Sequence, residues 1–180
     1  MISTHELQGN KPPFSEERLK EVQTIISKFP EGRHKSAVIR ILHMAEEDFG
    51  GWLSPETMDY VAGLLNIQPI EVYEVATFYT MFNLEPTGKF VFEVCRTGPC
   101  MLVGSDQIIE YIKNKIGISK VGETSADGIF TLKTAECLGA CGYAPMLQCG
   151  KVYHEHLTFE KVDQLIEEYR AKYAQLINQN

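Results

Sequence analysis

The first half of the chain repeats apolar residues with the period of an α-helix. Between residues 15 and 82 they recur every three or four positions, with turn-forming residues between segments. This pattern predicts four helices, over about 15–29, 36–49, 54–65 and 69–82. Ser15 and Ser54-Pro55 are helix-start signals, and Pro30 and Gly50-Gly51 end the first two segments. Four short helices with short connections are typical of a helical bundle.

The pattern changes after the turn-rich stretch Asn83–Lys89. Four strands are predicted, over 90–94, 130–132, 145–148 and 152–154, and two helices, one over 105–116 and one after Thr158. The order strand, helix, strand, hairpin, helix predicts an α/β layer with a small mixed sheet. We therefore expect an α+β or α/β protein of two domains, a helical bundle over residues 1–85 and a mixed-sheet domain over residues 86–180.

Composition narrows the classes of function. A net charge of −7 argues against a nucleic-acid-binding surface. No apolar run approaches the ~18 residues of a membrane helix, and the first ten residues lack a secretion signal. These features predict a cytosolic protein that reaches a membrane only through partners. Met1–Phe14 is interpreted as a mobile lead-in.

Four of the five cysteines form two close pairs. Cys95 and Cys100 enclose R-T-G-P, and Cys137 and Cys141 enclose L-G-A. Each loop follows a predicted strand, where rigid scaffolds often place functional groups. The glycines allow backbone N–H groups to approach sulfur closely. Two thiol pairs in such loops favour an iron–sulfur centre with Cys95, Cys100, Cys137 and Cys141 as ligands.

The residues alone leave simpler roles open for these thiols. Structural zinc also takes four thiolates, a redox disulfide usually has a C-x-x-C spacing that is absent here, and buried free thiols are common. A Rieske centre would need two histidines, and neither loop contains one. Cys149, on a predicted strand, is interpreted as a core or edge residue. Arg96 is expected to offset part of the charge of the centre.

Two further segments carry simpler interpretations. The aromatic residues Tyr73, Phe78, Tyr79 and Phe82 are expected mainly in the bundle core, although some of them could face a partner. The acidic run Glu46-Glu47-Asp48 is interpreted as a solvated helix end. The chain contains no phosphate-binding glycine loop and no nucleophile–base motif, so a complete active site is not expected.

Several separated motifs resemble one known family. E-V-Y-E-V-A-T-F-Y-T-M-F, V-C-R-T-G-P-C-M-L-x-G-S-D, V-G-E-T and A-E-C-L-G-A-C-G-Y-A-P-M are similar to the E subunits of bacterial NADH–quinone oxidoreductases, respiratory complex I. The likeness runs from about Ser15 to Tyr169 and implies an N-terminal bundle followed by a thioredoxin-like domain that holds one [2Fe–2S] cluster. On this resemblance, Cys95, Cys100, Cys137 and Cys141 fall on the four ligand positions.

The same resemblance implies a partner and a place of action. It implies an electron-transfer subunit in a tight heterodimer with a larger subunit, which carries FMN, the NADH site and a [4Fe–4S] cluster. Other subunits of the peripheral arm would complete a complex that is cytoplasmic and peripheral to the inner membrane. Similar subunits serve NAD-linked hydrogenases and formate dehydrogenases, and the sequence leaves these alternatives open.

Overall fold

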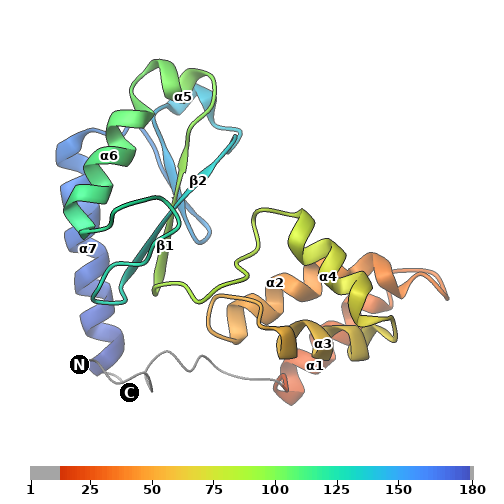
Figure 1. Cartoon of the computed structure of the whole chain (residues 1–180). Helices are drawn as coiled ribbons and strands as arrows, with labels where there is room; N and C mark the ends of the chain where they lie inside the picture. Colours follow the sequence, from red (N-terminus) through yellow and green to blue (C-terminus); the bar gives the residue numbers. More distant parts are fainter. Residues whose placement is uncertain (1–12, 179–180) are drawn as a thin grey trace. The chain divides into compact units, whose positions relative to one another are not determined.

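The computed structural model describes residues 13–178 and divides into two compact units, Met1–Pro86 and Thr87–Asn180 (Figure 1). Most of the predicted mobile lead-in, Met1–Phe14, lies outside the described residues. Each unit has an apolar core of its own, built from residues of that unit alone.

The first unit is a bundle of short helices, as predicted. Its elements are α1 (Glu16–Ile26), the 3₁₀ helix η1 (His34–Ala37), α2 (Val38–Asp48), α3 (Pro55–Leu65) and α4 (Pro69–Phe78). The Ser15 hydroxyl accepts from the Arg18 N–H and the Ser54 hydroxyl from the Thr57 N–H, which confirms both predicted helix starts. The apolar stripes of these helices pack into one core.

Several expectations for this unit differ from the structure, among them the end of α1, which lies at Ile26 rather than at residue 29. Phe14 is not part of a mobile segment: it is buried, stacks on Phe49 at 4.8 Å between ring centroids, and its N–H donates to the Tyr60 hydroxyl. Helix α4 ends at Phe78 rather than at residue 82, because the backbone turns extended at Tyr79. Phe78 and Tyr79 are therefore outside the core, 76% and 40% exposed, whereas Phe82 is buried as expected.

The acidic run at the end of α2 is also not simply solvated. Arg18 donates to both carboxylate oxygens of Asp48, at 2.8 and 2.9 Å, and pairs with Glu47 at 3.1 Å. The Glu46 carboxylate accepts the Asn83 N–H at 2.7 Å. These side chains connect α2 to α1 and to the segment that leaves the bundle.

The second unit is a sheet with its two longest helices on one face (Figure 1). Its strands are β1 (Phe90–Cys95), β2 (Phe130–Ala135), β3 (Leu147–Cys149) and β4 (Val152–His154), and its helices are α5 (Pro99–Leu102), α6 (Ser105–Ile116), η2 (Cys141–Tyr143) and α7 (Phe159–Asn178). The strand order is β2-β1-β3-β4, with β1 and β2 parallel and the other pairs antiparallel. This confirms the predicted small mixed sheet.

Strand pairing explains where the strands differ from prediction. β2 continues past Leu132 to Ala135 because it pairs with β1 residue by residue, and Cys95 faces Ala135 at the end of the register. β3 begins at Leu147 rather than Pro145. Within residues 13–178, no helix is long and apolar enough to cross a membrane.

Candidate metal centre

The two cysteine loops leave the sheet at the same edge. Cys95 is the last residue of β1, and Cys137 follows the end of β2 by two positions. Because β1 and β2 are parallel neighbours, the loops that follow them begin side by side. Cys100 lies in α5 and Cys141 begins η2, so short helices return both second cysteines toward the strand ends. Helix α5 was not predicted from the sequence.

The four thiols form one buried pair and one exposed pair. Cys95 and Cys100 are 2% and 1% exposed and pack with Met146 in a small apolar cluster. Cys137 and Cys141 are exposed. All five cysteines are free thiols. Buried inert thiols, an alternative that the sequence left open, do not describe Cys137 and Cys141.

The thiols of each pair interact, and the pairs are electrostatically connected. Cys95 hydrogen-bonds with Cys100, and Cys137 hydrogen-bonds with Cys141. The charge of Cys95 also raises the pKa of Cys141. Within the described residues, no three Cys, His, Asp or Glu side chains converge on a point as ligands of a single metal ion do. Two thiol pairs suit a centre with two irons, because each iron of a [2Fe–2S] cluster takes two thiolates.

The environment opposes simultaneous ionisation of the thiols. Burial would raise the pKa of Cys95, but hydrogen bonds from the Thr97 and Leu138 backbone outweigh it, so this pKa is lowered. Burial, followed by the hydrogen bond to Cys95, raises the pKa of Cys100 to about 11. The charge of Cys137, followed by burial, raises the pKa of Cys141. A bound cationic core would relieve the repulsion among thiolates.

Backbone N–H groups donate to the sulfurs, as expected from the glycines in the two loops. The Gly139 N–H donates to Cys137 Sγ at 3.4 Å, and Gly139 has φ of +76°, a conformation that side chains other than glycine rarely adopt. Such N–H groups stabilise thiolate charge and tune an iron–sulfur centre. The donor set therefore fits a [2Fe–2S] cluster: four thiols in two pairs, surrounded by N–H groups.

Cys149 lies in the sheet core, as predicted, and away from the two loops. In the sheet, Cys149 of β3 is paired with Phe92 of the neighbouring strand β1. Burial raises the pKa of the Cys149 thiol. Its neighbour is Tyr169 of α7, whose hydroxyl is 2.9 Å from His154 Nε2.

Sequence reasoning missed the role of Glu136. This carboxylate lies 3.5 Å from the Arg96 guanidinium and accepts the Thr97 hydroxyl at 3.1 Å, so it joins the second cysteine loop to the first. The one available signal was its position directly before Cys137. Arg96, expected to offset the charge of the centre, is therefore paired with an anion.

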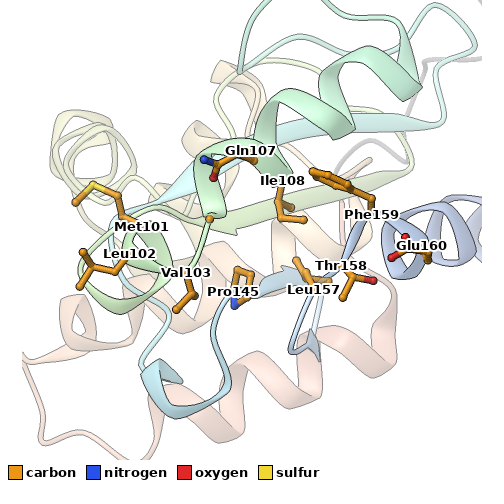
Figure 2. Close-up of a pocket in the computed structure, with 11 residues that line it drawn as sticks. Met101, Leu102, Val103, Gln107, Ile108, Pro145, Leu157, Thr158, Phe159 and Glu160 are labelled. Atoms are coloured by element: carbon orange, nitrogen blue, oxygen red, sulfur yellow. The ribbon is translucent and has the colours of Figure 1, made fainter.

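A hollow of about 560 Å³ lies beside the first cysteine loop (Figure 2). Figure 2 shows its walls: α5 and the start of α6 on one side, and Pro145 with the segment that enters α7 on the other. Three successive residues after Cys100 line it, Met101, Leu102 and Val103, and they are 51%, 81% and 54% exposed. An apolar surface thus adjoins the cysteines.

Comparison with solved structures supports the fold. Over 80% of its length, the chain resembles the crystal structure of an NAD⁺-reducing [NiFe]-hydrogenase in the air-oxidized state, with a TM-score of 0.67 and 19% identity. The H₂-reduced state gives a TM-score of 0.66 over 75% of the chain, again at 19% identity. The chain spans 24% and 22% of those two chains.

Comparison with characterised sequences identifies the family. The chain is 45% identical over 156 residues to the E subunit of the NADH-quinone oxidoreductase of Rickettsia felis, covering 87% of this chain and 93% of the relative. It is 43% identical over 157 residues to "NADH dehydrogenase [ubiquinone] flavoprotein 2, mitochondrial" of Dictyostelium discoideum, covering 87% of this chain and 63% of the relative. The model of the thioredoxin-like [2Fe–2S] ferredoxin family matches residues 22–170. The chain belongs to the thioredoxin-like [2Fe–2S] ferredoxin family.

Proposed function

We propose that this chain is the iron–sulfur electron-transfer subunit of the NADH dehydrogenase module of an NADH–quinone oxidoreductase. The observation that supports the proposal is that the two loops with the cysteine pairs begin side by side at the ends of β1 and β2, in a chain of this family. Similarity to the E subunits of rickettsial NADH-quinone oxidoreductases supports the choice of complex.

Cys95, Cys100, Cys137 and Cys141 would hold the [2Fe–2S] cluster. When bound, such a cluster accepts and returns one electron at a time. The buried pair Cys95 and Cys100 is fixed by packing on Met146, which excludes water from that side. The exposed pair faces solvent or a partner. Backbone N–H groups hold negative charge on the sulfurs.

The partner in this proposal is the subunit that binds FMN and NADH and carries a [4Fe–4S] cluster. A one-electron carrier needs another cofactor close by, and exposed apolar residues at a site mark a protein interface. Met101, Leu102 and Val103 follow Cys100, and Tyr143, which is 52% exposed, lies two positions after Cys141. In the first unit, Phe78, Tyr79 and Met81 offer a second apolar surface for assembly.

The complex would hold this chain on the cytoplasmic side, peripheral to the inner membrane, without direct insertion of the chain into the membrane. An NAD-linked hydrogenase is the second candidate assembly, since the fold also occurs in that enzyme. Purification of the tagged chain from its source cells discriminates between them. Co-purification of quinone-reductase subunits would support the NADH–quinone oxidoreductase. Co-purification of hydrogenase subunits would instead assign the chain to a hydrogenase, and its electron-transfer role would stand.

The experiment for the electron-transfer role uses the complex with the flavin subunit. We expect NADH to reduce the [2Fe–2S] cluster in the heterodimer and to leave the isolated chain oxidised, with both states followed by EPR. Leu102→Asp should weaken the heterodimer because it places charge in the apolar surface beside Cys100. Ile177→Asp on α7 is the matched control, since Ile177 is also exposed at 57%. A Leu102→Asp chain that associates as well as the control contradicts the docking surface.

A further inference from the structure

The two cysteine loops begin side by side at the end of the paired strands β1 and β2. Register pairing of β1 with β2 ends at Cys95 and Ala135, and the Arg96 N–H donates to the Ala135 carbonyl at 3.1 Å. Past this point the first loop continues to Cys100 in α5 and the second to Cys141 at the start of η2. A centre with ligands on both loops needs their separation held constant, because ligand geometry sets cluster stability.

Glu136 provides a side-chain connection at this place. Its Oε1 lies 3.5 Å from Arg96 Nε, and its Oε2 accepts the Thr97 hydroxyl at 3.1 Å. Both carboxylate oxygens thus contact the first loop, from a residue adjacent to Cys137. Its carbonyl oxygen is 4.0 Å from Cys95 Sγ. The Glu136 side chain is 81% exposed, so core packing does not account for its position.

The pair also determines the charge beside the thiols. Arg96 follows Cys95 and Glu136 precedes Cys137, so a cation and an anion lie next to one cysteine of each pair. Reduction of a [2Fe–2S] cluster adds one negative charge, so a lone Arg96 would favour the reduced state and a lone Glu136 would oppose it. As a pair their effects largely cancel.

We propose that Glu136 is a positioning residue that holds the two cysteine loops together through Thr97 and neutralises Arg96 beside the centre. This inference rests on the proposed ligand role of the four cysteines. Exposed ion pairs contribute roughly 0–1 kcal/mol to stability. This corresponds to changes in a rate or equilibrium constant of about five-fold or less. The hydrogen bond to Thr97 and the charge on Arg96 are separable by mutation.

The test uses the full chain with its cluster and two readouts, the midpoint potential and the rate of iron loss to a chelator. Glu136→Gln keeps an acceptor for Thr97 and removes the charge, so we expect a higher potential and an iron-loss rate close to wild type. Thr97→Val removes the hydrogen bond and keeps the charge, so we expect an unchanged potential and iron loss faster by about two- to five-fold.

Double substitution and a matched control complete the test. Arg96→Ala should lower the potential, and Arg96→Ala with Glu136→Ala should return it toward wild type. Glu110→Gln on α6 is the control, because Glu110 is also an exposed carboxylate paired with a cation, Lys113. If Glu136→Gln and Thr97→Val behave like this control in both readouts, the inference is wrong and the ligand proposal stands. A normal cluster in Cys95→Ser would instead refute the ligand proposal.

Discussion

The four cysteines of the candidate site differ in the contacts that fix their positions. Cys95 and Cys100 are fixed by the strand end and by packing on Met146, whereas Cys137 and Cys141 are exposed. The buried pair depends on the fold for its geometry, and the exposed pair depends on the loop connections near Glu136. Chelators and oxidants should therefore reach the centre from the side of Cys137 and Cys141.

Serine substitution tests the ligand set one residue at a time. Cys95→Ser, Cys100→Ser, Cys137→Ser and Cys141→Ser should each lose most bound iron and the EPR signal of the reduced cluster, because serine is a poor substitute for thiolate. Cys149→Ser is the matched control and should retain both, since Cys149 lies in the sheet core beside Phe92 and Tyr169. Loss of the cluster in Cys149→Ser together with a normal cluster in Cys95→Ser would overturn the assignment.

The candidate ligands could be predicted from the sequence, whereas Glu136 could not. The cysteines carry a local signal, two short spacings in glycine-containing loops after predicted strands. The contacts of Glu136 with Arg96 and Thr97 join residues about 40 positions apart, so they depend on the parallel register of β1 and β2. No local pattern encodes that register.

Gly88 illustrates a contact that constrains one element against another. An added Cβ would lie 2.8 Å from the Phe130 carbonyl carbon and 2.9 Å from its nitrogen, where β2 begins. We expect Gly88→Ala to destabilise the second unit by roughly 1–3 kcal/mol, because backbone atoms cannot move aside as a side chain would. Urea unfolding followed by circular dichroism measures this.

Gly63 in α3 is the control for the same substitution. An added Cβ meets no atom within 4 Å there, and the backbone is helical. Gly63→Ala should therefore stabilise the first unit by up to about 1 kcal/mol. Equal effects of the two substitutions would show that close backbone approach at Gly88 is not the cause.

Helix α7 is expected to loosen from the sheet in acid. The His154 ring is partly buried and forms a hydrogen bond with the Tyr169 hydroxyl of α7. Burial is the main cause of the lowered pKa of His154. Among nearby charges on α7, Glu168 opposes this shift, and Lys172 and Lys161 reinforce it. A histidine with a lowered pKa in the folded state contributes full stability above its unfolded pKa of ~6.5 and loses it as the pH falls further.

The measurement compares wild type with His154→Gln. Wild type should lose stability relative to the variant between about pH 7 and pH 5, by less than ~1 kcal/mol because the ring is only partly buried. Acid effects common to both proteins cancel in this difference. Parallel pH dependences of the two unfolding free energies would contradict the role of His154.

Helix and strand locations were predictable where local signals are strong. Ser15, Ser54-Pro55, Gly117 and Thr158 mark helix ends in both sequence and structure. The end of α4 was missed because the apolar pattern continues from Phe78 to Phe82 although the backbone becomes extended. Aromatic residues occur both in protein cores and on surfaces that bind a partner, and the spacing of apolar residues does not distinguish these two positions.

The division into two units predicts separable functions. The apolar cores of the two units share no residues. The cysteines and the loop contacts of Glu136 all lie in the second unit. A chain without Met1–Asn83 should therefore still take up a cluster and should bind the flavin subunit more weakly. Iron content and pull-down with that subunit check both results. Full binding by the truncated chain would show that the bundle does not serve assembly.

Metal and sulfide analysis of the purified chain, together with its visible and EPR spectra, is the most direct measurement. A [2Fe–2S] cluster predicts about two irons and two acid-labile sulfides per chain. It also predicts a red-brown colour and an EPR signal that appears on one-electron reduction. A colourless protein with about one zinc per chain and no sulfide would contradict the iron–sulfur role and leave a zinc-stabilised binding module in its place.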